Sequence, residues 1–251
     1  MNIRIYMLGT GTAVPIKRGL PCIVIRVDSD LYLLDVGEGC QNRIIHMGLG
    51  LVKIRGIFIT HMHGDHYLGL FGLIQSMRLL GKRSELTIIA PEELINVLNN
   101  LIEKNLVKFD YEYVLESVRE DIVYSDNKVR VSGFKVEHSI PSYGYLIEIG
   151  DRYRVVYSGD TMLCNKVIEV SEKADLLIHE ATFTSRDYVE AIEQKHSTAR
   201  DAALVASRAN VKNLVLTHIS PRYSDSLEIY RDAYRFFKNT IVAEDYMTIY
   251  F

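Results

Sequence analysis

Four side chains of metal-binding type fall within six residues of this 251-residue sequence. They are His61, His63, Asp65 and His66, and they come directly after the apolar run Ile57–Ile59. Neutral imidazole nitrogens and a carboxylate oxygen suit zinc, and manganese or iron fits the same donors. Such a dense group behind a buried strand predicts a metal site, in preference to a histidine-rich surface loop.

The spacing of these residues favours two ions. Alternate residues of an extended strand end lie on one side, so His61 and His63 can bind the same ion. The turn through Gly64 then directs Asp65 and His66 towards a second ion. Two ions bound together in this way are the arrangement that enzymes use for displacement at phosphorus. We therefore expect phosphodiester chemistry.

Further ligand-type side chains follow other apolar strands of the pattern. His138 follows the predicted strand 128–136, Asp160 follows Tyr153–Tyr157, and His218 follows the next such run. Taken singly, a histidine or aspartate of this kind is more often a core or turn residue. Their shared position favours metal ligation instead, because a binuclear site needs ligands from separate loops and a carboxylate can bridge two ions.

Asp35 ends another predicted strand, 31–34, and is followed by Gly37 and Gly39. This position suits a helix N-cap. It suits equally well a close approach to a second loop, where a carboxylate orients the imidazole of a metal ligand. The histidine cluster elsewhere in the chain favours the second interpretation.

Composition limits the class of protein. The chain is 48% hydrophobic and 24% charged, with no change of composition along its length, so we expect one α/β domain over residues 1–251. No apolar run approaches the roughly 18 residues of a membrane span, and the N-terminus enters a strand without a signal peptide. We therefore expect a cytoplasmic protein. The net charge of −3 means that any nucleic-acid substrate must be met by a local basic patch.

The three cysteines, Cys22, Cys40 and Cys164, are far apart and form no Cys-x-x-Cys pair. The spacing argues against a disulfide framework and against a thiolate zinc site. We expect three reduced thiols.

Hydrophobic periodicity and turn residues predict an alternation of strands and helices. We expect strands near 3–8, 22–27, 31–34, 57–59, 86–90, 111–116, 122–124, 128–136, 143–149, 153–157, 175–180, 213–217, 241 and 247–250. We expect helices near 68–74, 91–104, 198–206 and 226–237. Thr198, with Asp201 three residues later, predicts a capping box at the start of the third helix.

The order of these strand-end loops along the chain resembles the metallo-β-lactamase superfamily. That resemblance implies a four-layer αββα sandwich with metal ions at one edge. Within the superfamily, four segments resemble the ribonuclease Z family, whose members remove 3′ trailers from tRNA precursors. They are Asp35–Gln41, the His-Glu-Ala-Thr run His179–Thr182, His196–Thr198 and His218–Ser220.

The resemblance also implies a role for each residue of the site, with two zinc ions per chain. The ligands would be His61, His63 and His138 for one ion, and Asp65, His66 and His218 for the other, with Asp160 between them. Asp65 would orient or deprotonate the attacking water, and Glu180 with His196 would pass a proton to the leaving 3′ oxygen. Asp35 would orient a ligand imidazole.

The implied partners are a tRNA precursor and a second copy of the chain. The loop Pro15–Arg18 resembles the family's Pro-x-Lys-Arg element near the acceptor stem, although Gly19 stands where that element usually has Asn. Lys17, Arg18 and Arg222 are therefore the expected RNA contacts. A wider basic group that could assist them comprises Lys17, Arg18, Arg78, Lys82, Arg83 and Arg222.

One departure from the family leaves an alternative open. Members usually carry a long arm that grips the tRNA elbow, whereas here the segment Tyr143–Asp160 has room only for a hairpin. An arm-less metallo-phosphodiesterase acting on small or cyclic nucleotides is therefore the alternative, which the acidic net charge also favours. A non-catalytic, metal-stabilised RNA-binding subunit is disfavoured because every expected ligand is present.

Overall fold

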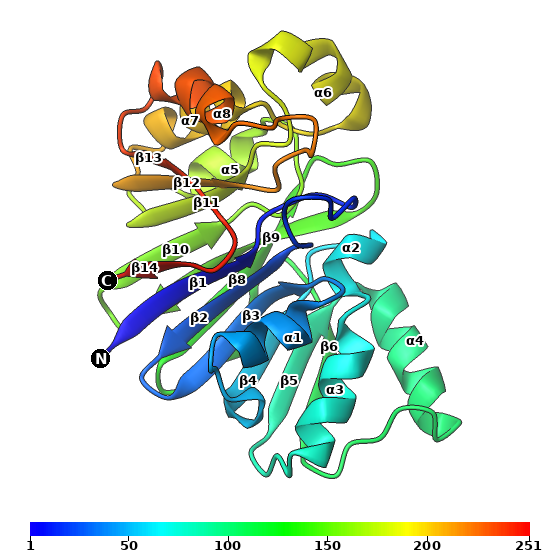
Figure 1. Ribbon diagram of the computed structural model, residues 1–251. Helices are drawn as coiled ribbons and strands as arrows, with labels where there is room; N and C mark the ends of the chain where they lie inside the picture. Colours follow the sequence, from blue (N-terminus) through cyan, green and yellow to red (C-terminus); the bar gives the residue numbers. More distant parts are fainter. The chain divides into compact units, whose positions relative to one another are not determined.

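The computed structural model describes residues 1–251 and divides the chain into two compact units (Figure 1). Unit 1 comprises Met1–Ala13, Gly19–Val118 and Glu244–Phe251. Unit 2 comprises Val14–Arg18 and Arg119–Ala243. The expectation of one domain over the whole chain stays a prediction. None of the helices is long and apolar enough to cross a membrane.

Unit 1 is built on a seven-stranded mixed sheet with the order β14-β1-β2-β3-β4-β5-β6. The pairs from β14 to β3 are antiparallel, and those from β3 to β6 are parallel. The parallel strands are rich in Ile, Leu and Val, as expected of buried strands. The strands are β1 (Ile3–Gly9), β2 (Cys22–Val27), β3 (Asp30–Val36), β4 (Ile54–Phe58), β5 (Leu86–Ala90), β6 (Tyr113–Ser117) and β14 (Met247–Tyr250).

The helices of unit 1 bury their apolar faces against this sheet. Figure 1 shows α1, α3 and α4 along this sheet. Ile44, Leu73 and Leu98, from these three helices, pack with strand residues in one core. Pro91 immediately before α4 starts that helix as predicted, because proline fits the first turn. The helical segments are α1 (Cys40–His46), η1 (Leu51–Lys53), α2 (Gly64–Tyr67), α3 (Leu70–Leu79) and α4 (Glu92–Glu103).

Unit 2 repeats the plan of the sheet, in the order β13-β12-β11-β10-β9-β8-β7. The pairs from β7 to β10 are antiparallel, and those from β10 to β13 are parallel. The strands are β7 (Ile122–Ser125), β8 (Val129–Val136), β9 (Ser142–Ile149), β10 (Tyr153–Tyr157), β11 (Leu176–Glu180), β12 (Asn213–Thr217) and β13 (Thr240–Val242). The sequence shows no repeat that corresponds to this repeated topology.

A second apolar core joins the helices of unit 2 to its sheet. Small residues of α7, such as Ala202 and Ala206, let that helix approach β11 and β12 closely. Thr198 and Asp201 form the predicted capping box at the start of α7. The helical segments are α5 (Asn165–Val170), η2 (Ser185–Asp187), α6 (Tyr188–Gln194), α7 (Ala199–Arg208) and α8 (Ser226–Tyr234).

The strand pattern agrees with the sequence predictions, but four short helices were missed. These are α1, α2, α5 and α6, each of four to seven residues and hence too short for a clear helical period. The helix predicted over 226–237 ends at Tyr234.

The expectation of three reduced thiols was wrong for two of them, because Cys22 and Cys40 form a disulfide. Their partnership follows from the sheet: Cys22 lies opposite Val36 in the β2–β3 pair, and the chain then turns into α1, which begins at Cys40. Sequence separation alone does not reveal this proximity. Cys164 is a free, buried thiol as predicted.

Candidate metal centre

The histidine cluster of unit 1 follows β4, and a buried carboxylate from the end of β3 organises it. Asp35 is fully buried and accepts hydrogen bonds from the main-chain N–H of Thr60 (2.8 Å) and from Nδ1 of His66 (2.8 Å). The hydroxyl of Thr60 lies 3.1 Å from each oxygen of Asp35 and 2.9 Å from Nδ1 of His61. Asp35 therefore lies where a carboxylate orients ligand imidazoles.

Two backbone features bring the β3 and β4 loops together. Asp35 has φ 57°, a left-handed conformation that is uncommon for residues other than glycine and that clusters at functional sites. Gly37 leaves room that a side chain would fill, because a Cβ there would lie 2.3 Å from the carbonyl oxygen of Asp65. The glycine after Asp35 thus permits the close loop approach that the sequence suggested.

The donor atoms of unit 1 form two pairs. Nε2 of His61 lies 3.0 Å from Nδ1 of His63, and Nε2 of His66 lies 3.6 Å from Oδ2 of Asp65. Two ligand atoms on one tetrahedral zinc, each about 2.0–2.2 Å from the ion, are separated by about 3.3–3.6 Å. Each pair therefore has a spacing that fits one ion, in the pairing that the sequence suggested.

The hydrogen bonds also identify the nitrogen that each imidazole offers. Because the carboxylate of Asp35 only accepts hydrogen bonds, Nδ1 of His66 carries the proton and Nε2 carries the lone pair. The hydroxyl of Thr60 donates to Asp35 and so accepts from Nδ1 of His61, which again leaves Nε2 as the ligand atom. Neutral imidazoles fixed in this way suit metal binding.

In unit 2, Asp160 and two histidines meet at the ends of separate strands. Asp160 follows β10 and Gly159, which has φ 59°. Its Oδ2 lies 3.4 Å from Nε2 of His218 and 4.0 Å from Nε2 of His138. His218 follows β12 with φ 57°, a second non-glycine residue in the left-handed region. Oδ2 of Asp160 therefore faces both imidazoles.

The orientation of His138 depends on the end of α6. Its Nδ1 donates to the carbonyl oxygen of Lys195 (2.9 Å), so Nε2 faces Asp160. Burial lowers the pKa of His138, although Asp160 and the Lys195 carbonyl oppose the shift. Burial therefore favours the neutral imidazole, and the hydrogen bond to Lys195 places its proton on Nδ1 and its lone pair on Nε2. By type and geometry, the His and Asp side chains of the chain are consistent with a binuclear metal centre.

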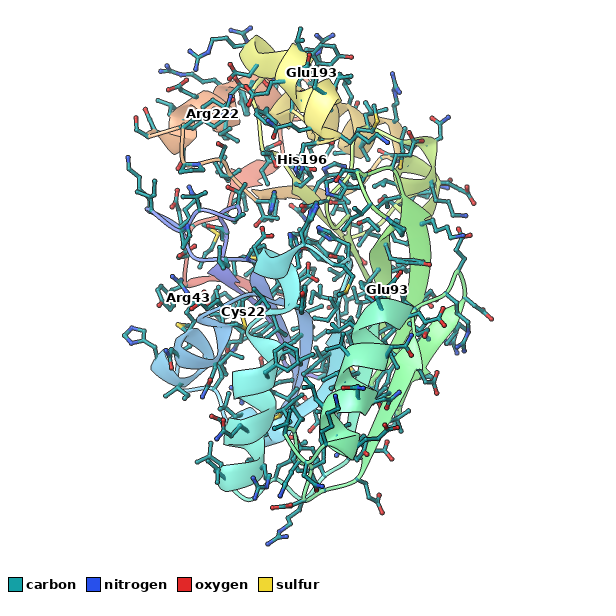
Figure 2. The ribbon with its side chains drawn as sticks, turned by 90° about the vertical axis from the view of Figure 1, so that its right-hand side faces the viewer. Cys22, Arg43, Glu93, Glu193, His196 and Arg222 are labelled. Carbon is teal, nitrogen blue, oxygen red and sulfur yellow. A yellow bond between two sulfur atoms is a disulfide. The ribbon has the colours of Figure 1, made fainter.

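Glu180 and His196 form the other pair predicted from the sequence. Nδ1 of His196 lies 2.7 Å from Oε1 of Glu180, and the two side chains are 13% and 1% exposed. Burial alone would raise the pKa of Glu180, but the charge and hydrogen bond of His196 outweigh it and lower the pKa. Figure 2 labels His196 on the segment that joins α6 to α7. Glu180 therefore holds the imidazole of His196 through Nδ1.

The sequence analysis assigned no role to three threonines that contact these groups. Thr60 touches Asp35 and His61, Thr161 donates its N–H to Oε1 of Glu180 (2.9 Å), and Thr182 touches Glu180 and His218. A hydroxyl next to a ligand has no spacing signature of its own. The one available signal was position, because Thr60 directly precedes His61 and Thr182 ends the His-Glu-Ala-Thr run.

Most of the basic side chains predicted near RNA have protein partners. Arg18 donates to the carbonyl oxygen of Ala243 (2.5 Å) and to Ser226 (2.8 Å). Arg222 forms a two-bond pair with Glu190 of α6, at 2.5 and 2.6 Å, and its guanidinium lies over the ring of Phe183. Its contact with RNA stays a prediction.

Lys82 does not belong to a surface patch. It is 1% exposed, and its ammonium donates to the carbonyl oxygen of Ile54 (2.6 Å) and to Ser84 (2.8 Å). Burial, with a smaller contribution from the charge of Arg55, lowers the pKa of Lys82 to about 8. Lys82 is therefore a buried structural residue of unit 1. It does not belong to the wider basic group that could assist RNA binding.

A polar cavity of about 640 Å³ lies at the opposite ends of the unit 2 strands from Asp160 and His218. The turns 125–130 and 148–154 form part of its wall. Its charged groups are largely paired within the protein: Lys212 contacts Asp175 at 2.7 Å, and Asp126 caps the N–H groups of its own turn. The cavity contains none of the predicted ligands.

Comparison with known proteins gives consistent matches. Residues 32–219 match the model of a β-lactamase superfamily domain. Ribonuclease Z of Sulfurisphaera tokodaii is 37% identical, over 96% of each chain, and ribonuclease Z of Methanothermobacter thermautotrophicus is 34% identical, over 98% of this chain and 96% of its own. The alignment with the first extends over 288 positions, more than the 251 residues of this chain, so that relative has segments without a counterpart here.

Solved structures agree with these sequence matches. The short form of human tRNase Z superposes with a TM-score of 0.84 at 30% identity, covering 98% of each chain. YhfI of Bacillus subtilis, a protein of the metallo-β-lactamase fold, superposes with a TM-score of 0.86 at 19% identity over the full length of both chains. At that identity the second match is evidence for the fold alone. Both matches confirm the predicted fold class.

Proposed function

This chain belongs to the ribonuclease Z family of metal-dependent hydrolases in the metallo-β-lactamase superfamily, and we propose that it removes 3′ trailers from tRNA precursors. The observation that carries this proposal is the hydrogen bond between Glu180 and His196. Cleavage of RNA leaves a 3′ oxygen that must receive a proton, and an imidazole held by a buried carboxylate can supply it.

We propose that the metal is zinc and that two ions bind per chain. The donors fit, because neutral imidazoles and carboxylates without thiolates suit zinc with an open position for catalysis. When bound, the ions supply Lewis-acid charge and lower the pKa of a bound water. The residues that would hold them are His61, His63, His138, Asp65, His66 and His218, with Asp160 as the bridge.

The protein groups would then control protons and orientation. Asp65, whose Oδ2 lies 3.6 Å from Nε2 of His66, would accept a hydrogen bond from the attacking water and orient it. His196, held through Nδ1 by Glu180, would donate from Nε2 to the leaving 3′ oxygen. The buried negative charge of Glu180 stabilises the imidazolium that this donation requires.

The RNA would be held by few basic side chains. Lys17 belongs to an exposed loop that Arg18 fixes to unit 2, and this loop is the proposed contact with the acceptor stem. The longer relatives have segments that are absent here, so we propose that elbow binding is weaker or is shared with a second copy of the chain. The homodimer and the cytoplasmic location remain predictions.

The test is cleavage of a 3′-extended tRNA precursor by the zinc-loaded protein, with bis(p-nitrophenyl) phosphate and a cyclic nucleotide as parallel substrates. We expect one cut next to the base that precedes the trailer, and no cut by Asp65→Ala with an unchanged circular dichroism spectrum. Turnover of the small diesters without cleavage of the precursor would reject the processing function in favour of an arm-less phosphodiesterase.

A further inference from the structure

The hydroxyl of Thr182 joins two parts of the unit 2 site that serve different purposes. It lies 2.7 Å from Oε2 of Glu180 and 2.9 Å from Nδ1 of His218, and it is 3.4 Å from Nδ1 of His196. Thr182 itself is 5% exposed, at the end of β11. A single buried side chain thus touches a proposed metal ligand and the proposed proton donor pair.

The direction of these hydrogen bonds follows from donor chemistry. Main-chain N–H groups, which can only donate, reach both oxygens of Glu180: Thr161 to Oε1 at 2.9 Å and Thr182 to Oε2 at 3.2 Å. Both oxygens are therefore acceptors, and the one hydroxyl proton of Thr182 goes to Oε2. The hydroxyl oxygen then accepts the proton of His218 Nδ1, which leaves Nε2 of His218 with the lone pair.

From this arrangement we propose that Thr182 is a positioning residue that fixes the metal-binding nitrogen of His218 and orients Glu180 for proton transfer. The proposal rests on the proposed function and adds that metal binding by His218 and proton transfer by Glu180 and His196 depend on the same hydroxyl. If the hydroxyl is lost, Nδ1 of His218 and Oε2 of Glu180 each lose a partner in a buried site, where water cannot replace it readily. Metal affinity and proton delivery should therefore fall together.

The sequence offers a matched control two residues away. Thr184 is also buried, at 6% exposure, but its hydroxyl donates to neither Glu180 nor His218, while its main-chain N–H donates to Tyr223 and its carbonyl oxygen accepts from the N–H of Asp187. Thr184→Val therefore makes the same chemical change as Thr182→Val without removing a hydrogen bond to Glu180 or His218. A difference between Thr182→Val and Thr184→Val can therefore be attributed to the hydrogen bonds of the Thr182 hydroxyl. It cannot be due to the replacement of a hydroxyl by a methyl group, which both variants share.

The experiment uses the full chain with Thr182→Val, Thr182→Ser and Thr184→Val. Zinc affinity is measured by competition with a chromogenic chelator, and kcat and KM are measured with the 3′-extended tRNA at saturating zinc. For Thr182→Val we expect zinc affinity to fall about 10–100-fold at one site and kcat to fall by a similar factor, with KM changed less than about threefold. Thr182→Ser restores both quantities to within about threefold, and Thr184→Val leaves both unchanged.

Wild-type zinc affinity together with wild-type kcat in Thr182→Val would overturn the proposal, and so would a defect that Thr182→Ser does not rescue. If Thr182→Val fails to fold, Thr182→Ala carries the same expectation. The zinc measurement needs no RNA. A wild-type protein that binds zinc tightly but does not cleave the precursor would therefore reject the proposed function, while the affinity of Thr182→Val still tests the link to His218.

Discussion

Units 1 and 2 each place a carboxylate, a threonine and imidazoles at the ends of parallel strands. The two groups differ in how deeply the imidazole next to the carboxylate is buried. In unit 1, Asp35 contacts Thr60 and His66, and His66 is fully buried. In unit 2, Glu180 contacts Thr182 and His196, and the His196 side chain is 13% exposed. The buried imidazole suits a fixed ligand, whereas the partly exposed one suits exchange of a proton with a substrate.

The repeated sheet plan explains why the two groups arise at similar places. β3 and β10 each stand between an antiparallel neighbour and a parallel one. Asp35 ends β3, and Asp160 follows β10 after Gly159. Both carboxylates therefore come at the carboxyl end of a strand that has one parallel and one antiparallel neighbour. Unit 2 adds α6, and the segment after α6 carries His196.

The largest effect should come from removing a ligand of unit 1. His66→Ala takes away a proposed ligand nitrogen and also a donor to the buried carboxylate of Asp35. Outer-shell changes cost about 10–100-fold in metal affinity or activity, so we expect the loss of a ligand to exceed that, with activity about 10³-fold lower. Metal analysis should show close to one zinc per chain instead of two.

Full metal content with near-normal activity in His66→Ala would contradict the assignment of unit 1 to metal binding. His46→Ala is the control, because His46 is an exposed histidine of α1 that only contacts the ring of Tyr246. Circular dichroism separates loss of metal from loss of fold.

A different pattern is expected for the imidazole of unit 2. His196→Ala removes the proposed proton donor, and general acid catalysis contributes about 10²–10⁴-fold, so kcat should fall by that factor. Zinc content should stay at two per chain and KM should change little, because His196 is not among the proposed ligands. A substrate with a p-nitrophenolate leaving group, which needs no proton, should be cleaved at nearly the wild-type rate.

Equal loss on both substrates would show that His196 acts on the metal ligands or on substrate binding. His66→Ala is expected to lower zinc content, whereas His196→Ala is expected to lower kcat at unchanged zinc content. Comparing the two variants therefore distinguishes the metal-binding role proposed for unit 1 from the proton transfer proposed for unit 2.

Sequence reasoning identified the groups that carry a spacing pattern. The dense run His61–His66 lies on one strand end, and Asp160 and His218 each follow an apolar strand, so periodicity located all of them. The same reasoning could not find Thr182 or Thr60, because their role depends on which carboxylate lies within hydrogen-bond distance of them. That distance is a property of strand order and register and has no local signal.

Two other features could not be predicted from the sequence, because they depend on which segments lie next to each other in the fold. α6 has only seven residues, of which Ala191 alone is buried, and its importance comes from where its end places Lys195 and His196. The Cys22–Cys40 disulfide depends on the pairing of β2 with β3. Strand existence could be predicted from composition, whereas strand neighbours could not.

The smallest effect we predict concerns this disulfide, which belongs to unit 1 alone. It closes a loop with a sequence separation of 18 that contains β3 and Asp35. In the loop-entropy description such a cross-link contributes about 3 kcal/mol to the free energy of unfolding. Urea unfolding with a reductant present should therefore show lower stability than without it, and Cys22→Ala/Cys40→Ala should not respond to the reductant.

Hydrogen exchange can assign this loss to one unit. Amides of β1 to β3 should lose protection in the double variant, while those of β11 and β12, which no disulfide braces, should keep theirs. Cys164→Ala is the control for the removal of a buried thiol, because Cys164 lies in the core of unit 2. Equal loss of protection in both units would mean that the two units unfold together in one cooperative transition. The units would then differ in the roles of their side chains but not in their stability.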